Sequence, residues 1–266
     1  MMIRRYCHTD LATAGIHTSY GQSMVELLVI LPVMLLLIFG TIQFALIYHA
    51  KITLNYAAYE GVRAGTLNCN AVSEDYSDQC NSEIGQYDAV KEGFARGLAP
   101  LYSYFEPDAK KRGKMDTPAG NQVEAFQQGR QRIFKEFESE YDFIRIERLN
   151  PTEKAFTDFA VDDVIPNDNL KYRTRIGGAN SETSLQDANL LHLRFTYWYP
   201  LYVPFVNRIM FDTVICCKGI PDAFGCKWAQ DPVCSTTDPR IPITSTAVMR
   251  MQAPVENSSR YYSSDN

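Results

Sequence analysis

The chain has 266 residues, of which 45% are hydrophobic, so it can bury the core of one sizeable domain and carry appendages. Its formal net charge is −5, which gives no electrostatic reason to expect a nucleic-acid-binding protein. Aromatic residues are frequent, at 12% with 16 Tyr, and this composition suits strands and interfaces.

The first element predicted along the chain is a membrane-spanning helix. From Leu27 to Ala50 there is no Asp, Glu, Lys or Arg, and about 20 helical residues suffice to cross a bilayer. A cleaved secretory signal has a shorter apolar region, and a buried core helix is the soluble alternative. Apolar spacing continues after the run, so we expect one helix from about Ser23 to about Gly65, with its second half in water.

The cysteines favour one orientation of this span, whereas basic residues flank it on both sides and do not. One cysteine, Cys7, precedes the span, and six follow it: Cys69, Cys80, Cys216, Cys217, Cys226 and Cys234. An even set in a loop-rich region is typical of an oxidising compartment. The part of the chain after the span is therefore predicted to lie outside the cytoplasm.

We expect one disulfide between Cys69 and Cys80 and two among the last four cysteines. Those four allow three pairings and the sequence does not choose, although an adjacent Cys216–Cys217 bond would strain the peptide between them. A zinc site is the alternative, but the C-C-x8-C-x7-C spacing lacks the C-x2–4-C pair of structural zinc sites. No metal or other cofactor is expected.

The rest of the chain predicts an α+β domain. Helices are expected in residues 84–105 and from Gln122 onward, the second with Val123, Phe126, Ile133, Phe134 and Phe137 as its apolar members. Strand patterns follow in "YDFIRIERL", which ends at Asn150-Pro151, in "NLLHLRFTYWYPL" and in "IPITSTAVMRM". A short helix is expected in "VPFVNRIMFDTVICC", and a loose tail in "NSSRYYSSDN".

The predicted architecture is therefore a long N-terminal transmembrane helix that continues into a disulfide-bearing α+β domain with helices and an antiparallel sheet of at least three strands. We divide the chain into a leader, the long helix and an α+β domain outside the cytoplasm: residues 1–21, 22–66 and 67–266.

Signals for an enzyme are weak. The sequence has no G-x-S-x-G, no H-E-x-x-H and no phosphate-binding loop. His192 lies in a strand pattern and is more simply a strand residue than a base. The acidic group of Asp158, Asp162, Asp163 and Asp168 lacks the spacing of a calcium loop and is interpreted as a solvated turn. The chain is not expected to be an enzyme.

Gly21 and Glu26 admit two interpretations. Ser23-x-x-Glu26 fits the capping box that begins a helix, and a carboxylate there also suits the helix dipole. Alternatively, cleavage after Gly21 would leave Gln22 as a new N-terminus and Glu26 as the fifth residue of the mature chain. A carboxylate in the apolar layer costs roughly 2.5–3.5 kcal/mol unless it is paired. The new α-ammonium of a neighbouring subunit could pair with it.

The segment "GQSMVELLVILPVMLLLIFGTIQFALIYHAKITLNYAAYEGVRAG" resembles the TadE-like minor pseudopilins of the tight-adherence (Flp, type IVc) pilus. The stretches "LRFTYWYPLYVPFVN" and "IPITSTAVMRMQAPVE" are similar to the closing strands of that family. The resemblance leaves residues 68–185 unmatched, and the leader is longer than that of a minimal prepilin.

The resemblance implies that a prepilin peptidase cleaves between Gly21 and Gln22 and that Glu26 is the assembly carboxylate. It also implies a pilin-like C-terminal domain in the periplasm and a single pass through the bacterial inner membrane, with a cytoplasmic N-terminus and scope for incorporation into the pilus. The expected partners are the prepilin peptidase, major and other minor pilins, the inner-membrane assembly platform and membrane lipid. The alternative is a signal-anchored binding or adhesion protein, for example at the pilus tip, that is never cleaved.

Overall fold

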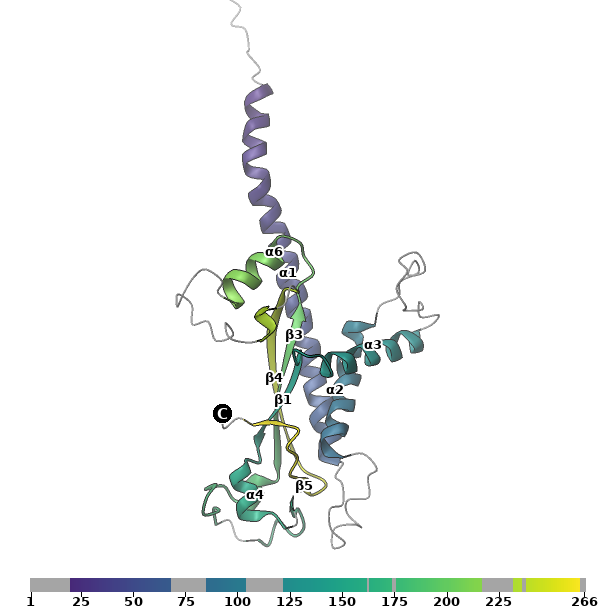
Figure 1. Cartoon of the computed structure of the whole chain (residues 1–266), viewed down its shortest axis with the longest axis vertical. Coiled ribbons are helices and arrows are strands. Elements are labelled where there is room, and N and C mark those ends of the chain that lie inside the picture. Colours follow the sequence, from purple (N-terminus) through teal and green to yellow (C-terminus); the bar gives the residue numbers. More distant parts are fainter. Residues whose placement is uncertain are drawn as a thin grey trace, which may run out of the picture.

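A single long helix organises the whole molecule. The computed structural model describes residues 20–67, 85–103, 122–161, 163–173, 176–216, 232–235 and 238–263. Helix α1 (Tyr20–Leu67) has 48 residues and is therefore about 72 Å long at 1.5 Å per residue. Its first half projects from an α+β domain and its second half is packed into that domain (Figure 1). The predicted helix and fold class are confirmed.

The three predicted strands form one antiparallel sheet. Strand β3 (Leu190–Pro200) lies between β1 (Ile144–Asn150) and β4 (Arg240–Arg250), and pairs with both in the antiparallel sense. The sheet has one addition that we did not predict, β6 (Tyr262–Ser263), which runs parallel to β1. Two further short strands, β2 (Val164–Ile165) and β5 (Val255–Glu256), pair separately.

The predicted helices are also present. They are α2 (Gln86–Tyr102), α3 (Gln122–Phe137) and, in the 203–217 region, α6 (Val206–Ile209), which continues as a π-helix over Met210–Ile215. Shorter helices are α4 (Glu153–Phe159), α5 (Leu185–Ala188) and a 3-10 turn at Pro232–Ser235. In α3, Ile133 is buried as expected, but Val123 is exposed because the N-terminal end of α3 projects from the domain (Figure 1).

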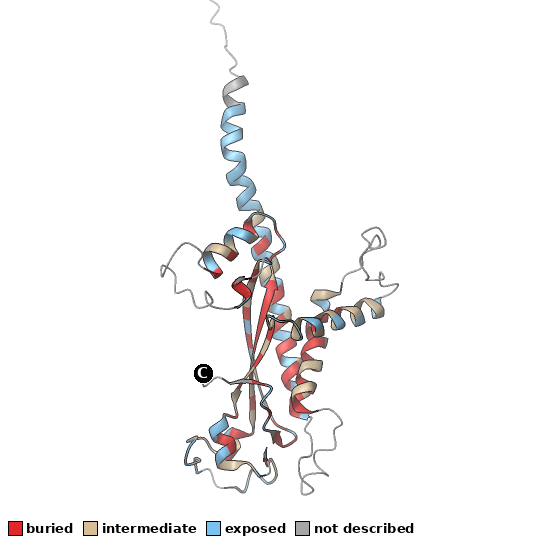
Figure 2. Ribbon diagram, in the orientation of Figure 1, coloured by how far each residue is buried: buried red, intermediate tan, exposed pale blue. Residues whose placement is uncertain are grey.

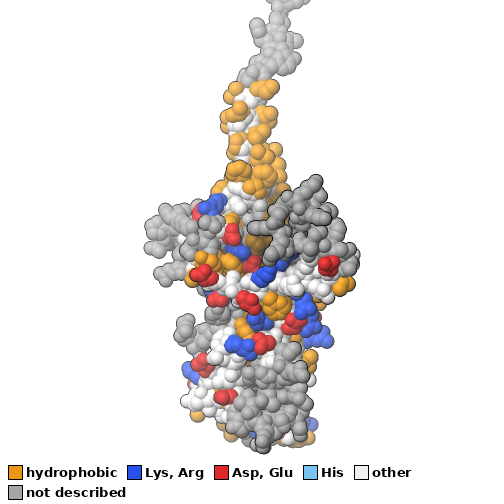
Figure 3. Space-filling model, turned by 45° about the vertical axis from the view of Figure 1, so that its right-hand side comes forward, with side chains coloured by type: hydrophobic (Ala, Val, Ile, Leu, Met, Phe, Trp, Pro, Cys, Tyr) orange, Lys and Arg blue, Asp and Glu red, His pale blue; other side chains and the backbone are white. Residues whose placement is uncertain are grey.

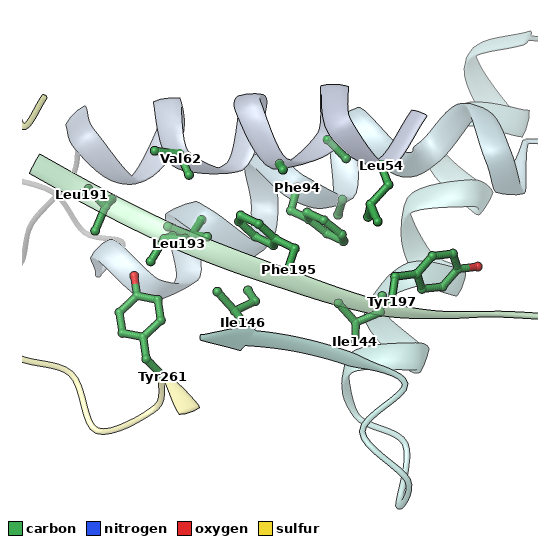
Figure 4. Packing of buried hydrophobic residues seen from close by; sticks show 14 of the residues in the cluster. Leu54, Val62, Phe94, Ile144, Ile146, Leu191, Leu193, Phe195, Tyr197 and Tyr261 are labelled. Carbon is green, nitrogen blue, oxygen red and sulfur yellow. The ribbon is translucent and has the colours of Figure 1, made fainter. Parts of the chain in front are cut away.

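The main core lies between β3 and the two helices α1 and α2. Alternate residues of a strand point to one face of its sheet, and on β3 this set includes Leu191, Leu193, Phe195 and Tyr197 (Figure 4). Phe94 of α2 stacks on Phe195 with ring centroids 4.8 Å apart. The second half of α1 is thus one wall of the core, and no tether separates it from the domain.

The expectation of a loose C-terminal tail is wrong as far as residue 263. Tyr261 is buried, and the Arg148 guanidinium lies over its ring and over that of Phe156, at 5.2 and 4.6 Å from the centroids. Arg260 donates to both carboxylate oxygens of Asp88, at 2.8 and 2.9 Å. Two arginines therefore fix this segment against β1 and α2.

Candidate functional site

The N-terminal half of α1 is apolar and uncovered. Every residue from Met24 to Ile38 is exposed (Figure 2), and apolar side chains predominate on the face of this part of the helix that Figure 3 shows. Within the part of the chain that the structure describes, α1 is the one helix long and apolar enough to cross a membrane. A core helix of a soluble domain would be mostly buried, so that alternative does not fit.

The start of α1 contradicts the capping-box interpretation. The helix begins at Tyr20, so Ser23 lies inside it and cannot be its N-cap, and its first turn contains no acidic residue. Gly21 and Gln22 fall in that first turn, and their backbone alone is described. The Glu26 carboxylate lies on an exposed part of the helix, at the edge of the apolar run. A helix-start role therefore does not account for Glu26 in this chain.

Gln43 marks the point where the domain begins to cover α1. Its side chain is fully buried, and its Oε1 accepts the backbone N–H of Val203 at 2.9 Å. Further along α1, Lys51 donates to the Thr244 carbonyl of β4. The Gln43 contact fixes the β3–α6 loop at the level where the exposed half of α1 ends.

Small residues let α1 and α2 approach each other closely. An added Cβ on Gly97 would lie 2.5 Å from the Cα of Ala57, and one on Gly93 would lie 2.6 Å from the Glu60 carbonyl oxygen. Gly93 and Gly97 form a G-x-x-x-G pattern, the spacing that allows close helix packing. This pattern is present in the sequence, and we did not predict the helix contact from it. The small residues at this contact therefore serve to let the two helix backbones pack closely.

The opposite face of α1 is not covered by the domain. Its exposed members recur every three or four residues, as expected for one face of a helix. They are Phe44, Tyr48, Ile52, Tyr56 and Tyr59, which we name the open face of α1. Glu26 precedes Phe44 by 18 residues, or five turns at about 3.6 residues per turn, so it lies in line with this face.

The comparison with protein families matches this helix. The model of the family described as TadE-like protein matches residues 21–63. This segment is TadE-like. The match confirms the family resemblance and is consistent with a TadE-like protein of the tight-adherence pilus system. Comparison with curated proteins and with solved structures gives no match.

The TadE-like segment contains all three residues predicted for processing and assembly, Gly21, Gln22 and Glu26. It extends through Gln43 and ends at Arg63, so it includes both the exposed half of α1 and most of the part packed against α2. The matched range therefore corresponds to one continuous helix with two environments, one apolar and uncovered, the other enclosed by the domain.

Beyond the TadE-like segment, the structure selects one cysteine pairing. Cys216 and Cys234 form a disulfide with their Cα atoms 5.6 Å apart. The bond joins the end of the π-helix to the 3-10 turn before β4, beside the buried Trp198 and Phe211. The other candidates, Cys69, Cys80, Cys217 and Cys226, lie outside the described residues, so the Cys69–Cys80 bridge stays a prediction.

Within the described ranges, the residues considered for catalysis or metal binding are not gathered into a site. His192 is half-buried in β3, and burial together with the nearby Arg194 charge lowers its pKa. Asp168 pairs with Arg173 at 3.0 Å. Asp162 lies outside the described residues, and among those described no group of three or more His, Cys, Asp or Glu could hold a metal ion.

Asp158 has a structural partner instead. Its carboxylate accepts hydrogen bonds from the backbone N–H and side chain of Asn180 and from the backbone N–H and hydroxyl of Ser181. Partial desolvation acts to raise the pKa of Asp158, but these hydrogen bonds outweigh it and lower the pKa. The carboxylate therefore closes a turn between α4 and α5.

Proposed function

We propose that the chain is a minor pseudopilin that acts in the assembly or priming of a tight-adherence (type IVc) pilus. The observation that carries the proposal is the TadE-like match over residues 21–63, which contains both Gly21 and Glu26. A prepilin peptidase would cleave between Gly21 and Gln22. The mature chain would cross the bacterial inner membrane once through α1, with its domain in the periplasm.

Electrostatics supports an assembly role for Glu26. An unpaired carboxylate costs roughly 2.5–3.5 kcal/mol at the centre of a membrane-spanning helix. The cost is smaller at the edge of the hydrocarbon layer, where Glu26 would lie, and an opposite charge would reduce it further. Cleavage would create such a charge, the α-ammonium of Gln22, in every mature subunit. A neighbouring subunit would bring that ammonium to Glu26, so membrane packing would favour processed subunits over unprocessed ones.

The two faces of α1 support the same proposal. The domain covers one face through α2 and the sheet, and the open face stays available over the same length of helix. Because Glu26 lies in line with the open face, a neighbouring helix could contact both at once. The partners that fit are other pilins and the inner-membrane assembly platform, with the prepilin peptidase acting before them.

The proposal is tested by the intact mass of the protein purified from its own cells, with and without the prepilin peptidase. A peptidase-dependent chain that begins at Gln22 is expected. Gly21→Ala should keep the leader, since a pocket fitted to glycine excludes a Cβ atom. A chain that stays uncut in both strains would overturn the proposal and favour a signal-anchored binding or adhesion protein.

The role of Glu26 is tested separately with Glu26→Gln, which removes the charge and keeps the shape. This variant should be cleaved and inserted normally but lose co-purification with other pilins and lose pilus assembly. Glu60→Gln is the matched control, because Glu60 is a carboxylate on the same helix outside the apolar half. If Glu26→Gln and Glu60→Gln both assemble like the parent, Glu26 has no assembly role.

A further inference from the structure

A second apolar surface lies at the end of the domain nearest the exposed half of α1. It belongs to the segment between β3 and the Cys216–Cys234 disulfide, which includes α6 (Figure 1). Its exposed apolar side chains are Tyr202, Phe205, Ile209 and Val214, of which Phe205 is 75% exposed. We name these four residues the α6 apolar surface.

Backbone hydrogen bonds place three of these residues on successive turns of the segment. Phe205 is the N-cap residue of α6, and its carbonyl oxygen accepts the backbone N–H of Ile209 at 3.3 Å, so the two residues lie one turn apart. Val214 follows Ile209 by five residues, in the stretch where the helix is a π-helix with i to i+5 hydrogen bonds. The change of helix type therefore extends a row of apolar side chains that a regular α-helix would rotate away.

Phe205 is also held in an unfavourable backbone conformation. Its φ is 66° and ψ is −54°, and the N–H of Val206 donates to the carbonyl of Pro204 at 2.8 Å, which closes a γ-turn of the strained, positive-φ form. A bulky residue rarely adopts positive φ. Such strain persists where the surrounding structure imposes it, and it is a reason to look for function.

The length of the apolar run indicates the depth of this surface. The uncharged run begins at Leu27, and 20 helical residues, as far as Leu46, cover about 30 Å, the thickness of the hydrocarbon core of a bilayer. Gln43 therefore falls within about one turn of the edge of the hydrocarbon layer, and its hydrogen bond to Val203 holds the start of the α6 segment near that level. Phe44 and Tyr48 are exposed on α1 just beyond this level.

We infer that the α6 apolar surface docks into the headgroup layer of the leaflet on the side of the domain. Aromatic residues with apolar bodies concentrate at that depth, and an apolar helix face lying in the plane of the interface is a recognised mode of membrane contact. Tyr202 and Phe205, with Phe44 and Tyr48 of α1, would form one aromatic belt. The inference rests on the proposed membrane span of α1, and it adds a second contact that limits tilting of the domain.

Depth-dependent fluorescence quenching tests the inference with three single substitutions in the full chain, reconstituted alone into lipid vesicles. Phe205→Trp probes the surface, Leu35→Trp probes the span, and Tyr172→Trp is the control at an exposed position 81% accessible to solvent. Lipids brominated high or deep on the acyl chain quench nearby indoles, and each signal is compared with the parent chain, whose own tryptophans are unchanged.

The expected result is that shallow bromines quench Phe205→Trp at least roughly twofold more than Tyr172→Trp, since aromatic rings sit at headgroup depth. Deep bromines should quench Leu35→Trp. Quenching of Leu35→Trp without extra quenching of Phe205→Trp would overturn the inference and leave the span intact, because Phe205 would then lie outside the lipid. If Leu35→Trp is not quenched, the span and the inference both fail.

Discussion

The close contact between α1 and α2 gives a prediction whose magnitude follows from the structure. In Gly97→Ala the new Cβ would lie 2.5 Å from the Cα of Ala57, whereas ordinary contact begins at 3.4 Å, so the helices must separate by about 0.9 Å. The obstacle is backbone, which cannot rotate aside. Overpacking of this kind costs about 1–3 kcal/mol, and the better helix propensity of alanine returns about 0.8–1.0 kcal/mol.

Because the clash involves backbone, we take the upper end of the overpacking cost, about 3 kcal/mol, and subtract about 1 kcal/mol for the helix propensity of alanine. The net destabilisation of about 2 kcal/mol should lower Tm by roughly 4–8 °C for a chain of this size. The assay is thermal unfolding of the full chain in detergent micelles, followed by circular dichroism. Two alanine substitutions in α1 serve as graded controls. An added Cβ on Gly61 has its nearest atoms at 3.2 Å, and one on Gly40 has none within 4 Å.

The expected order of Tm is Gly40→Ala highest, then Gly61→Ala, then Gly97→Ala. If Gly97→Ala unfolds at the same temperature as the parent chain, α2 can move away from α1 without loss, and their close contact does not contribute to the stability of the domain. A loss in Gly40→Ala as large as that in Gly97→Ala would also refute the reasoning, because nothing lies near an added Cβ at Gly40.

Two further predictions concern the disulfide and a carboxylate. Replacing both Cys216 and Cys234 by serine should lower the free energy of unfolding by roughly 3 kcal/mol, since the bond closes a loop with a sequence separation of 18. Reductant should lower the Tm of the parent chain by breaking this bond, and this effect should be absent from the double-serine variant. The stabilisation that comes from the lowered pKa of Asp158 should be complete above the ordinary value of 3.8 and be lost as the pH falls through the folded value. The measurement is the amide exchange rate of Ser181 as a function of pH, which should rise as Asp158 becomes protonated. In Asp158→Asn this rise should be absent, and an unchanged rise would mean that another group is responsible.

Local patterns predicted the elements of this fold because their signals are local. The uncharged run defined α1, and alternation between polar and apolar residues defined β3. Contacts between distant residues were not predictable in this way. Arg148 donates to Asn257, 109 residues later in the chain, and no local pattern in the C-terminal segment indicates that an arginine of β1 will order it.

The candidate site divides in the same way. The spacing of Gly21 and Glu26 is evident from the sequence alone, because both residues lie within one helix. The Ser23 capping box was wrong because the helix begins earlier, at Tyr20, and a capping motif does not determine a helix start by itself. The position of the α6 segment beside α1 was not predictable, since it depends on the hydrogen bond between Gln43 and Val203, 160 residues apart.

The placement of α1 in the core has a mechanical consequence. A pull on the domain along the axis of α1 loads the whole α1–β4 and α1–α2 interfaces in shear, and the Lys51 to Thr244 hydrogen bond is among the contacts that resist sliding. The helix could slip only by exposing partners such as Phe94 and Phe195 to water. Force applied to the domain therefore passes directly along the axis of α1 to its apolar half.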